Sequence, residues 1–491
     1  MQAASHPDLQ RLPRSTPEEH GVDSGAIGAF LDAAAATGQE LHSLMLLRHG
    51  TVIAEGSWAP YDLRRKRLSN SISKSFTSAA IGLAQAEGLL SIEDSVMQYF
   101  PDSVPVDRDP KLPRMRIKHL LAMASGHDVD TVIPVLQSGS SDWVEAFLAL
   151  PIAHEPGTFF KYNTGATYML SAILQRVTGT TLVDYLQERL FLPLGIADVT
   201  WDACPKGITA GGWGLSLTTE EMARFGQLYL NGGRWQGRQL IPEDWVQASV
   251  RPQIANGDNQ GSDWASGYGY QFWCNRYGTY RADGAFGQII LVMPNEEAVL
   301  AFTSSLSDLS QVLNAVWSHL LPALQAGRQV LPADEAAYAR LQSKLEQLAV
   351  AAPEHKAAPF APYAGKIYNL VDNVLGLRRL TLHPDSEGGG IYWQDEAGEH
   401  RFTVGEDEWA LTEWPLAAEL WKPGERPRRI AAAAAGRWQE DGSYRIYLRL
   451  LDTAYQDELT CRFEGENVTI TYHRHFSVTP LAVEPITGVS N

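Results

Sequence analysis

The sequence predicts an α+β domain followed by a separate all-β domain, and the patterning of apolar residues carries this prediction. Up to about residue 345, segments with apolar residues at helical spacing alternate with a few strand-like runs. The stretch at 346–362 is rich in alanine and proline, as linkers often are. Residues 363–491 then consist of short segments with period-two alternation between turn residues. We therefore expect a mixed domain at 1–345 and a barrel or sandwich at 363–491.

The elements of the first domain follow from the spacing of apolar residues. The predicted helices lie at residues 24–36, 71–87 and 116–123 and, after a mostly helical stretch to about residue 250, at 309–326. Gly88 follows the second of these helices, and glycine commonly ends a helix. The predicted strands lie at 41–54 (two strands that meet at His49-Gly50), 267–274, 289–293 and 298–303. In the second domain the clearest strands are 444–450, 459–463 and 468–472.

Composition and charge exclude several classes of partner. The net charge is −17, so nucleic acid and anionic membrane surfaces are poor partners. No apolar run approaches the roughly 18 residues that span a bilayer, and the polar first residues do not resemble a signal peptide, so we expect a cytoplasmic protein. The three cysteines are far apart, and the spacing of His127-Asp128 and Asp130 does not provide the ligand set of a metal site, so a polar loop is expected there. We predict no metal and no organic cofactor, while the oligomeric state stays open.

Ser71 and Lys74 form the first candidate catalytic pair. They are three residues apart at the start of a predicted helix, so their side chains lie on one face. The small apolar residues that follow indicate a buried helix, and burial lowers the pKa of a lysine. A neutral Lys74 can take the proton of Ser71, next to anion-binding N–H groups of the helix N-terminus. This motif alone is equally compatible with a capping serine and a surface lysine.

Tyr162 is the second candidate. It lies in an aromatic-rich turn, at residues 156–162, that leads into another predicted helix. A phenol has an ordinary pKa near 10, and neighbouring ammonium groups stabilise the phenolate. A tyrosine beside a lysine is therefore a candidate base for Ser71, although a tyrosine before a helix most often only packs.

Together these motifs resemble those of class C β-lactamases and related serine hydrolases. Ser71-Ile72-Ser73-Lys74 is similar to Ser-x-x-Lys, Tyr162-Asn163-Thr164 is similar to Tyr-x-Asn, and Ala282-Asp283-Gly284 stands where Lys-Thr-Gly or His-x-Gly is expected. Segments 117–126 and 214–223 also resemble the family, so the resemblance covers about residues 15 to 325. It implies a β-lactamase/transpeptidase-like fold, with an antiparallel sheet flanked by helices and a helical subdomain.

The resemblance also implies roles for individual residues. Ser71 would be the acylated nucleophile, with Lys74 and Tyr162 as coupled general bases. Tyr162 would later protonate the leaving group. The N–H groups of Ser71 and Ala285 would form the oxyanion hole. Four further residues would contact the substrate, namely Asn163, Thr164, Asp283 and Gly284.

Two departures from the family pattern narrow the activity. Thr164 replaces the asparagine of Tyr-x-Asn, so a carboxamide becomes a hydroxyl. Ala282 replaces the lysine or histidine whose cation would bind a penicillin carboxylate, and Arg281 could substitute only in part. The third motif is most similar to the esterase and amide-hydrolase branches, such as the 6-aminohexanoate-dimer hydrolases. These features disfavour an efficient β-lactamase.

Three functions are compatible with these residues. The favoured one is a serine hydrolase of small esters or amides, because Ser71, Lys74 and Tyr162 are all present. The alternatives are a D-aminopeptidase or related peptidase, and a non-catalytic binder of β-lactam or cell-wall-like ligands. A Ser-His-Asp triad is disfavoured because no Gly-x-Ser-x-Gly elbow surrounds a serine.

Overall fold

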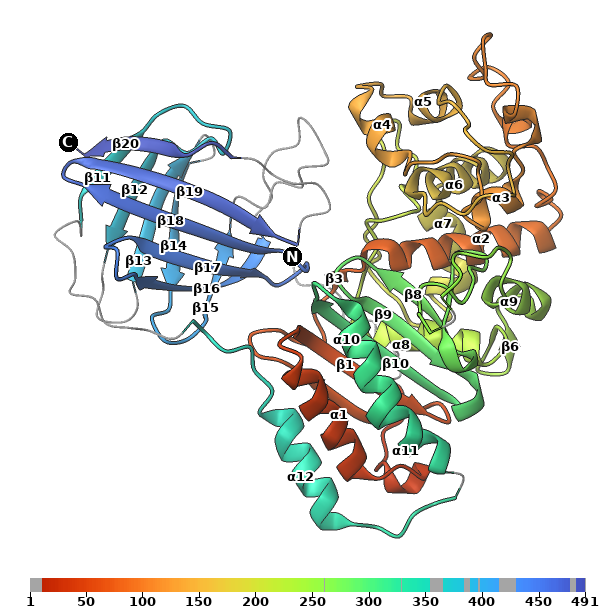
Figure 1. The fold of residues 1–491 in the computed structure, drawn as a ribbon, viewed down its shortest axis with the longest axis horizontal. Coiled ribbons are helices and arrows are strands. Elements are labelled where there is room, and N and C mark those ends of the chain that lie inside the picture. The colour runs from red at the N-terminus through yellow and green to blue at the C-terminus, as the bar shows by residue number, and fades with distance from the viewer. Residues whose placement is uncertain are drawn as a thin grey trace. The chain divides into compact units, whose positions relative to one another are not determined.

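The computed structural model describes residues 11–259, 261–327, 329–353, 365–383, 389–395, 398–414, 430–476 and 483–490. The chain divides into two compact units (Figure 1). The catalytic-motif unit comprises Met1–Gly56, Leu68–Ser304 and Asp308–Glu346. The β unit comprises Ser57–Arg67, Ser305–Ser307 and Gln347–Asn491. Residues 354–362 of the predicted linker lie outside the described residues, so the predicted boundaries of 345 and 363 stay predictions.

A six-stranded sheet forms the centre of the catalytic-motif unit, in the order β2-β1-β10-β9-β8-β7. β8 pairs antiparallel with β7 and β9, and β9 pairs antiparallel with β10. β9 and β10 are buried along their whole length, as their continuous apolar sequences indicate. The strands are β1 (Glu40–Arg48), β2 (Thr51–Ser57), β7 (Trp273–Cys274), β8 (Tyr280–Gly284), β9 (Gln288–Met293) and β10 (Ala298–Ser305), with short strands β3 (Arg67–Leu68), β4 (Ser216–Leu217), β5 (Arg234–Trp235) and β6 (Arg238–Gln239).

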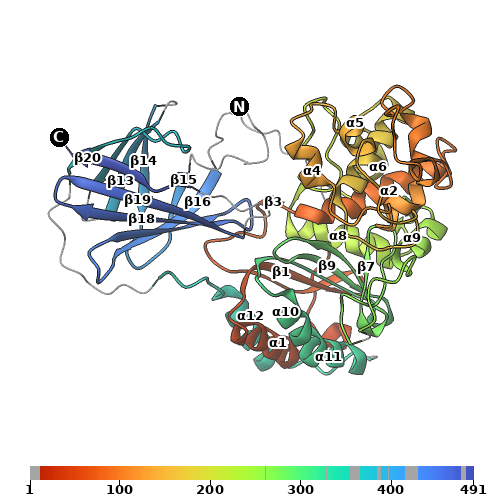
Figure 2. The same ribbon diagram turned by 45° about the horizontal axis from the view of Figure 1, so that its top comes forward.

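Helices cover both faces of this sheet. On one face lie α1 (Ser24–Ala36), α10 (Leu309–Ala315), α11 (Leu321–Ala326) and α12 (Glu335–Glu346), and on the other lies α8 (Thr219–Leu230), as Figure 2 shows. Gly226 lets α8 approach closely, because a Cβ atom there would lie 2.7 Å from Ile290 and 2.6 Å from Val299. The sheet and α8 therefore share one apolar core.

A helical subdomain contains the Ser71 helix (Figure 1). Its helices are α2 (Ser73–Ala86), α3 (Ile117–Leu121), α4 (Val132–Gln137), α5 (Trp143–Leu148), α6 (Thr164–Thr178), α7 (Leu182–Leu186) and α9 (Glu243–Val250). α2 is buried from Ser73 to Ala84, and the ring of Phe76 stacks on Phe225 of α8 at 3.8 Å between centroids. Within the described part of the chain, no helix has both the length and the apolar character needed to cross a membrane.

The predicted elements match the observed ones best where the apolar pattern is long. The helix predicted at 24–36 is α1, and the helix predicted at 309–326 is α10 and α11 joined by a π-helical turn at Val316–Leu320. The strand predicted at 267–274 is wrong over most of its length, because only Trp273–Cys274 forms a strand. Positive φ angles at Gly267 and Gln271 break the extended backbone before it.

The β unit is a ten-stranded antiparallel near-barrel, in the order β14-β13-β12-β11-β20-β19-β18-β17-β16-β15. Gly405, just after the end strand β14, donates from its N–H to the Ala434 carbonyl and accepts from the Gly436 N–H, which links that end of the sheet to β16, next to the other end strand. The strands are β11 (Ile367–Leu370), β12 (Arg379–His383), β13 (Gly389–Asp395), β14 (Gly398–Val404), β15 (Ala410–Trp414), β16 (Ile430–Trp438), β17 (Tyr444–Leu450), β18 (Gln456–Glu464), β19 (Asn467–His475) and β20 (Ile486–Ser490). The expectation of an all-β C-terminal domain is confirmed.

Candidate active site

The structure brings Ser71 and Lys74 together. Ser71 lies in a single 3-10 turn, Asn70–Ile72, that runs directly into α2. Nζ of Lys74 lies 2.9 Å from Oγ of Ser71, and the side chain of Lys74 is almost fully buried, at 1% exposed. Nζ also donates to the carbonyl of Gly212 at 2.8 Å and to Oγ1 of Thr164 at 3.3 Å. Lys74 is therefore a buried lysine and not a surface one.

Burial changes the acid–base behaviour of Lys74. It lowers the pKa of the amine from 10.5 to about 7, while the charges of Asp130 and Asp283 raise it. Removal of an ammonium group from water penalises its charged form, which explains the direction of the shift. Near neutral pH the neutral amine and the ammonium form are therefore both populated.

Tyr162 lies beside this pair, on the loop that leads into α6. Nζ of Lys74 is 4.9 Å from the centroid of the Tyr162 ring, and the ring stacks on Trp273 at 5.5 Å. Burial raises the pKa of the Tyr162 phenol well above its ordinary value, although its hydrogen bond with Ser71 and the charge of Arg281 lower it. The resting phenol is therefore protonated at neutral pH.

Asn163 and Thr164 differ in their surroundings. Asn163 is completely buried, and its Oδ1 accepts from Oγ1 and the N–H of Thr131 at 2.6 and 3.0 Å. The same oxygen caps α6 at the N–H of Ala166. Asn163 thus has no exposed surface for the substrate contact that the resemblance implied, and both ends of its amide are engaged in internal hydrogen bonds. Thr164, in contrast, faces Lys74 with its hydroxyl.

The segment after β8 contains the second amide expected in the oxyanion hole, that of Ala285. Among the described residues, neither this N–H nor the N–H of Ser71 has a protein acceptor. Gly284 is required at the end of β8, because a Cβ atom there would lie 2.2 Å from the carbonyl oxygen of Ser69. The two amides are therefore available to a ligand oxygen.

Two amide side chains hold the carbonyl side of this segment. Nδ2 of Asn70 donates to the Ala285 carbonyl at 3.0 Å, and Nε2 of Gln288 donates to the same oxygen at 3.3 Å. Asn70 and Phe286 both have positive φ angles, of 48° and 66°, which are uncommon for non-glycine residues. No sequence motif identified Asn70 as a site residue. Its one signal was a residue tolerant of this conformation directly before Ser71.

The third motif positions Arg281 and Asp283 next to each other. The guanidinium of Arg281 has no exposure, donates to Oδ2 of Asp283 at 2.7 Å, and lies 4.1 Å from the centroid of the Trp264 ring. Burial raises the pKa of Asp283, while Arg281 and Lys74 lower it. Ala282 points into the apolar core. Arg281 is thus an internal partner of Asp283 and offers no exposed cation to a substrate carboxylate.

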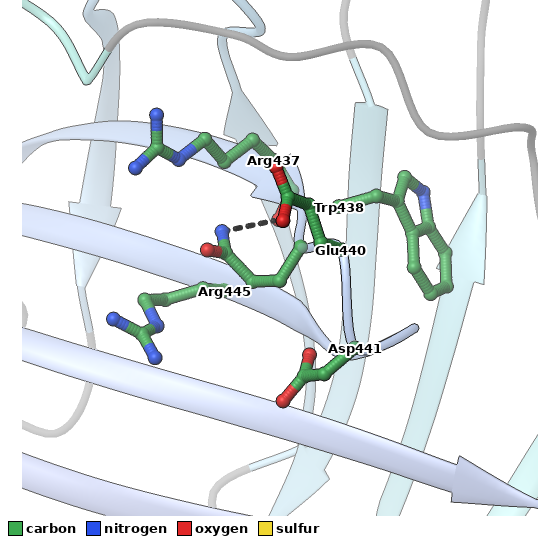
Figure 3. Close-up of a pocket in the computed structure, with 6 residues that line it drawn as sticks. Arg437, Trp438, Glu440, Asp441 and Arg445 are labelled. Carbon is green, nitrogen blue, oxygen red and sulfur yellow. Dashed lines mark hydrogen bonds between the residues drawn. The ribbon is translucent and has the colours of Figure 1, made fainter.

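A pocket in the β unit is a poor candidate for the active site. Figure 3 shows it at the turn between β16 and β17, lined by Arg437, Trp438, Gln439, Glu440, Asp441 and Arg445. Arg445 pairs with Glu458 at 3.3 Å, and Asp441 pairs with Arg462 at 3.1 Å, so these charges are neutralised within the unit. The lining contains no serine, cysteine or histidine. In the described part of the chain, no group of three or more potential metal ligands occurs.

The sequence is similar to known proteins over more than half of its length. A family model described as Beta-lactamase matches residues 31–320. The chain is 25% identical over 289 residues to the 6-aminohexanoate-dimer hydrolase of Paenarthrobacter ureafaciens, a match that covers 54% of this chain and 73% of that protein. It is 26% identical over 201 residues to the lovastatin esterase of Penicillium rubens, covering 36% and 49%. It is 30% identical over 165 residues to the D-aminopeptidase of Brucella anthropi, covering 31% of each chain.

One solved structure shows the same fold. A Bacillus anthracis protein provisionally described as a 6-aminohexanoate-dimer hydrolase superposes with a TM-score of 0.54 and 20% sequence identity. The superposition covers 66% of this chain and 89% of that one. The expected β-lactamase/transpeptidase-like architecture is confirmed.

Proposed function

Because the chain belongs to the beta-lactamase family of serine hydrolases, we propose that it cleaves small esters or amides through an acyl-enzyme on Ser71. Lys74 carries this proposal, since its Nζ lies 2.9 Å from Oγ of Ser71 and the lysine as a whole is only 1% exposed. With a pKa of about 7, Lys74 is partly a neutral amine at neutral pH and accepts the proton of Ser71. Oγ then attacks the substrate carbonyl carbon, and the amides of Ser71 and Ala285 donate to the developing oxyanion.

Tyr162 supplies the proton that the leaving group needs. Its pKa is raised, so the phenol starts protonated and acts as the acid. It donates to the departing alcohol or amine as the C–O or C–N bond breaks, and the Lys74 ammonium returns a proton to it. Water then attacks the acyl-enzyme, Lys74 takes a water proton, and Ser71 recovers that proton when the acid product leaves.

The charges around Ser71 favour substrates without a carboxylate next to the reacting bond. Arg281 is buried in its pair with Asp283, and position 282 is alanine. A penicillin carboxylate therefore meets no exposed cation from this strand. Neutral esters and amides have no carboxylate to pair with such a cation, so its absence does not weaken their binding.

Labelling with a fluorophosphonate probe tests the acyl-enzyme proposal. Mass spectrometry of the digested protein should find one adduct, on the peptide that contains Ser71. Ser71→Ala should abolish the adduct and the hydrolysis of p-nitrophenyl esters while it leaves thermal unfolding unchanged. Folded wild-type protein that forms no adduct, or an adduct that survives in Ser71→Ala, contradicts the proposal.

A peptidase that acts on substrates with a free amino group is the second candidate, and Asp283 favours it. One of its carboxylate oxygens pairs with Arg281, and the group interacts electrostatically with Lys74. A carboxylate near the reacting carbonyl can bind a substrate ammonium group. Faster turnover of D-amino acid amides than of neutral esters, lost in Asp283→Asn, selects this candidate.

A non-catalytic binder of β-lactam or cell-wall-like ligands is the remaining alternative. Thermal stabilisation by a β-lactam without product formation favours it.

A further inference from the structure

Asp130 is hydrogen-bonded to Thr164, which is itself hydrogen-bonded to Lys74. It does not contact Ser71 or Lys74 directly. It lies in the loop before α4. Its Oδ2 accepts the hydroxyl hydrogen of Thr164 at 2.8 Å. Its Oδ1 accepts the N–H of Thr164 at 2.8 Å and the N–H of Val132 at 3.1 Å. One carboxylate oxygen therefore fixes the hydroxyl of Thr164, and the other fixes its backbone.

This arrangement determines which way the hydrogen bond between Thr164 and Lys74 runs. A hydroxyl has a single hydrogen, and an ionised carboxylate can only accept. The hydrogen of Thr164 is committed to Asp130, so its oxygen must accept from Nζ of Lys74 at 3.3 Å. The carbonyl of Gly212, at 2.8 Å, can also only accept. A neutral amine has two hydrogens and one lone pair, so both hydrogens are used by these two acceptors.

We propose that Asp130 is a positioning residue that acts through Thr164 to direct the lone pair of neutral Lys74 at the hydroxyl of Ser71. This inference rests on the proposed function, in which Lys74 is the base. Without Asp130, the hydroxyl of Thr164 is free to turn and donate its hydrogen to Nζ. It then competes with Ser71 for the one lone pair, and fewer molecules are ready to accept the serine proton. The chain thus combines Thr164, at the position where the family pattern has asparagine, with Asp130, which orients its hydroxyl.

The same carboxylate acts on the titration of Lys74. The groups that face the amine are Asp130 from the loop before α4, Asp283 from β8 and the phenol of Tyr162, with Arg281 behind Asp283. Asp130 and Asp283 both raise the pKa of Lys74. Removal of the Asp130 charge therefore lowers that pKa, and the acid limb of the activity profile moves to lower pH. A residue with a merely structural role changes the amount of folded enzyme and leaves this limb in place.

The test compares Asp130→Asn with Asp128→Asn, an exposed aspartate of the same loop that serves as the matched control. In Asp130→Asn the plateau of kcat/KM for a p-nitrophenyl ester should fall on the order of 10- to 100-fold. The acid limb should shift below that of the wild type, and Asp128→Asn should change neither quantity. Thr164→Ser, which keeps the hydroxyl, should retain most of the activity, whereas Thr164→Val should lose activity because one hydrogen of Nζ loses its acceptor. The double variant Asp130→Asn/Thr164→Val should lose no more than Thr164→Val alone, because no hydroxyl remains to compete for the lone pair of Lys74.

A second measurement separates this inference from the proposed function. The titration of Lys74, followed by NMR of its labelled side chain, should shift to lower pH in Asp130→Asn and stay unchanged in Asp128→Asn. Normal thermal unfolding shows that the variants are folded. An unchanged Lys74 titration, an unshifted acid limb, or additive losses in the double variant overturns the role of Asp130. Failure of the wild type to label at Ser71 overturns the proposed function instead, and the NMR titration still decides the coupling.

Discussion

Each unit of this protein contains a buried cation, Lys74 in one and Arg474 in the other, and burial is accompanied by opposite pKa shifts in the two. Lys74, in the catalytic-motif unit, contacts the hydroxyls of Ser71 and Thr164 and the carbonyl of Gly212, and burial lowers its pKa to about 7. Arg474, in the β unit, donates to both oxygens of Asp457 at 2.7 and 2.8 Å. Burial lowers the pKa of Arg474 too, but the hydrogen bonds and charge of Asp457 outweigh it, so the pKa is raised.

The difference shows what makes a buried charge reactive. Arg474 is locked to a carboxylate on the neighbouring strand, and Tyr472 donates to that carboxylate at 2.7 Å. Lys74 has carboxylates near it, but each is engaged with another group, Asp130 with Thr164 and Asp283 with Arg281. Direct pairing makes a cation structural, whereas a carboxylate held one group away leaves an amine that can gain and lose a proton.

The largest expected effect comes from removal of the reactive cation. Lys74→Met should lower kcat/KM for a p-nitrophenyl ester by about 10²- to 10⁴-fold, because Ser71 loses its proton acceptor. Lys74→Arg should be equally inactive, since a guanidinium does not become neutral at neutral pH. Steady-state kinetics on folded protein measures both variants. Activity in either one above a tenth of the wild-type value contradicts the role of Lys74 as the base.

Removal of the structural cation should act on stability instead. Arg474→Met leaves Asp457 as a buried charge without its partner, and the free energy of unfolding of the β unit should fall by about 3–5 kcal/mol. Arg445→Met is the matched control, because its ion pair with Glu458 is partly exposed and should contribute less than about 1 kcal/mol. Urea unfolding followed by tryptophan fluorescence measures both. Equal losses in the two variants would remove the contrast between buried and exposed pairs.

A smaller effect is expected in the pH dependence of stability, and it comes from the titration of Lys74. The folded pKa of Lys74 is about 7 and lies below its unfolded value of 10.5, so the unfolded chain binds more protons between these values. Stability from this group therefore rises as pH increases through that window, by about 2 kcal/mol between pH 7 and pH 9. The difference in unfolding free energy between wild type and Lys74→Met should show this slope. A difference that is flat with pH means that Lys74 titrates normally in the folded protein.

Substitution of Asn70, a neutral buried residue, should have the smallest effect on activity. Asn70→Gly keeps the positive φ angle but removes the hydrogen bond to the Ala285 carbonyl, so the oxyanion segment is less well held. The rate constant kcat should fall by about tenfold, with KM nearly unchanged. Affinity for a boronate transition-state analogue should weaken in parallel. Asn70→Ala should lose the same activity and also some stability, because alanine is strained at this φ. Full activity in Asn70→Gly would make Asn70 a purely conformational residue.

Much of the architecture and the centre of the site were predictable from local pattern. The helical spacing of α1 and the period-two alternation of β17 and β19 each describe contacts with one face of a core, and such a pattern survives in any tertiary setting. The proximity of Ser71 and Lys74 was predictable in the same way, because a spacing of three residues in helical backbone brings two side chains together whatever surrounds them.

Tertiary structure decided the features that depend on partners distant in the chain. Ala431–Ala435, a run of strong helix formers, lies in the strand β16 because β15 and β17 pair with it on both sides. Asn163 became a buried cap through Thr131, and Asp130 reached Thr164 across 34 residues. The pKa of Lys74 likewise depends on burial by the helices and the sheet. By itself the sequence determined which residues could react, through spacing along one element. Only the fold decided which of them are buried, paired or free to exchange a proton, because those properties depend on neighbours that no local spacing encodes.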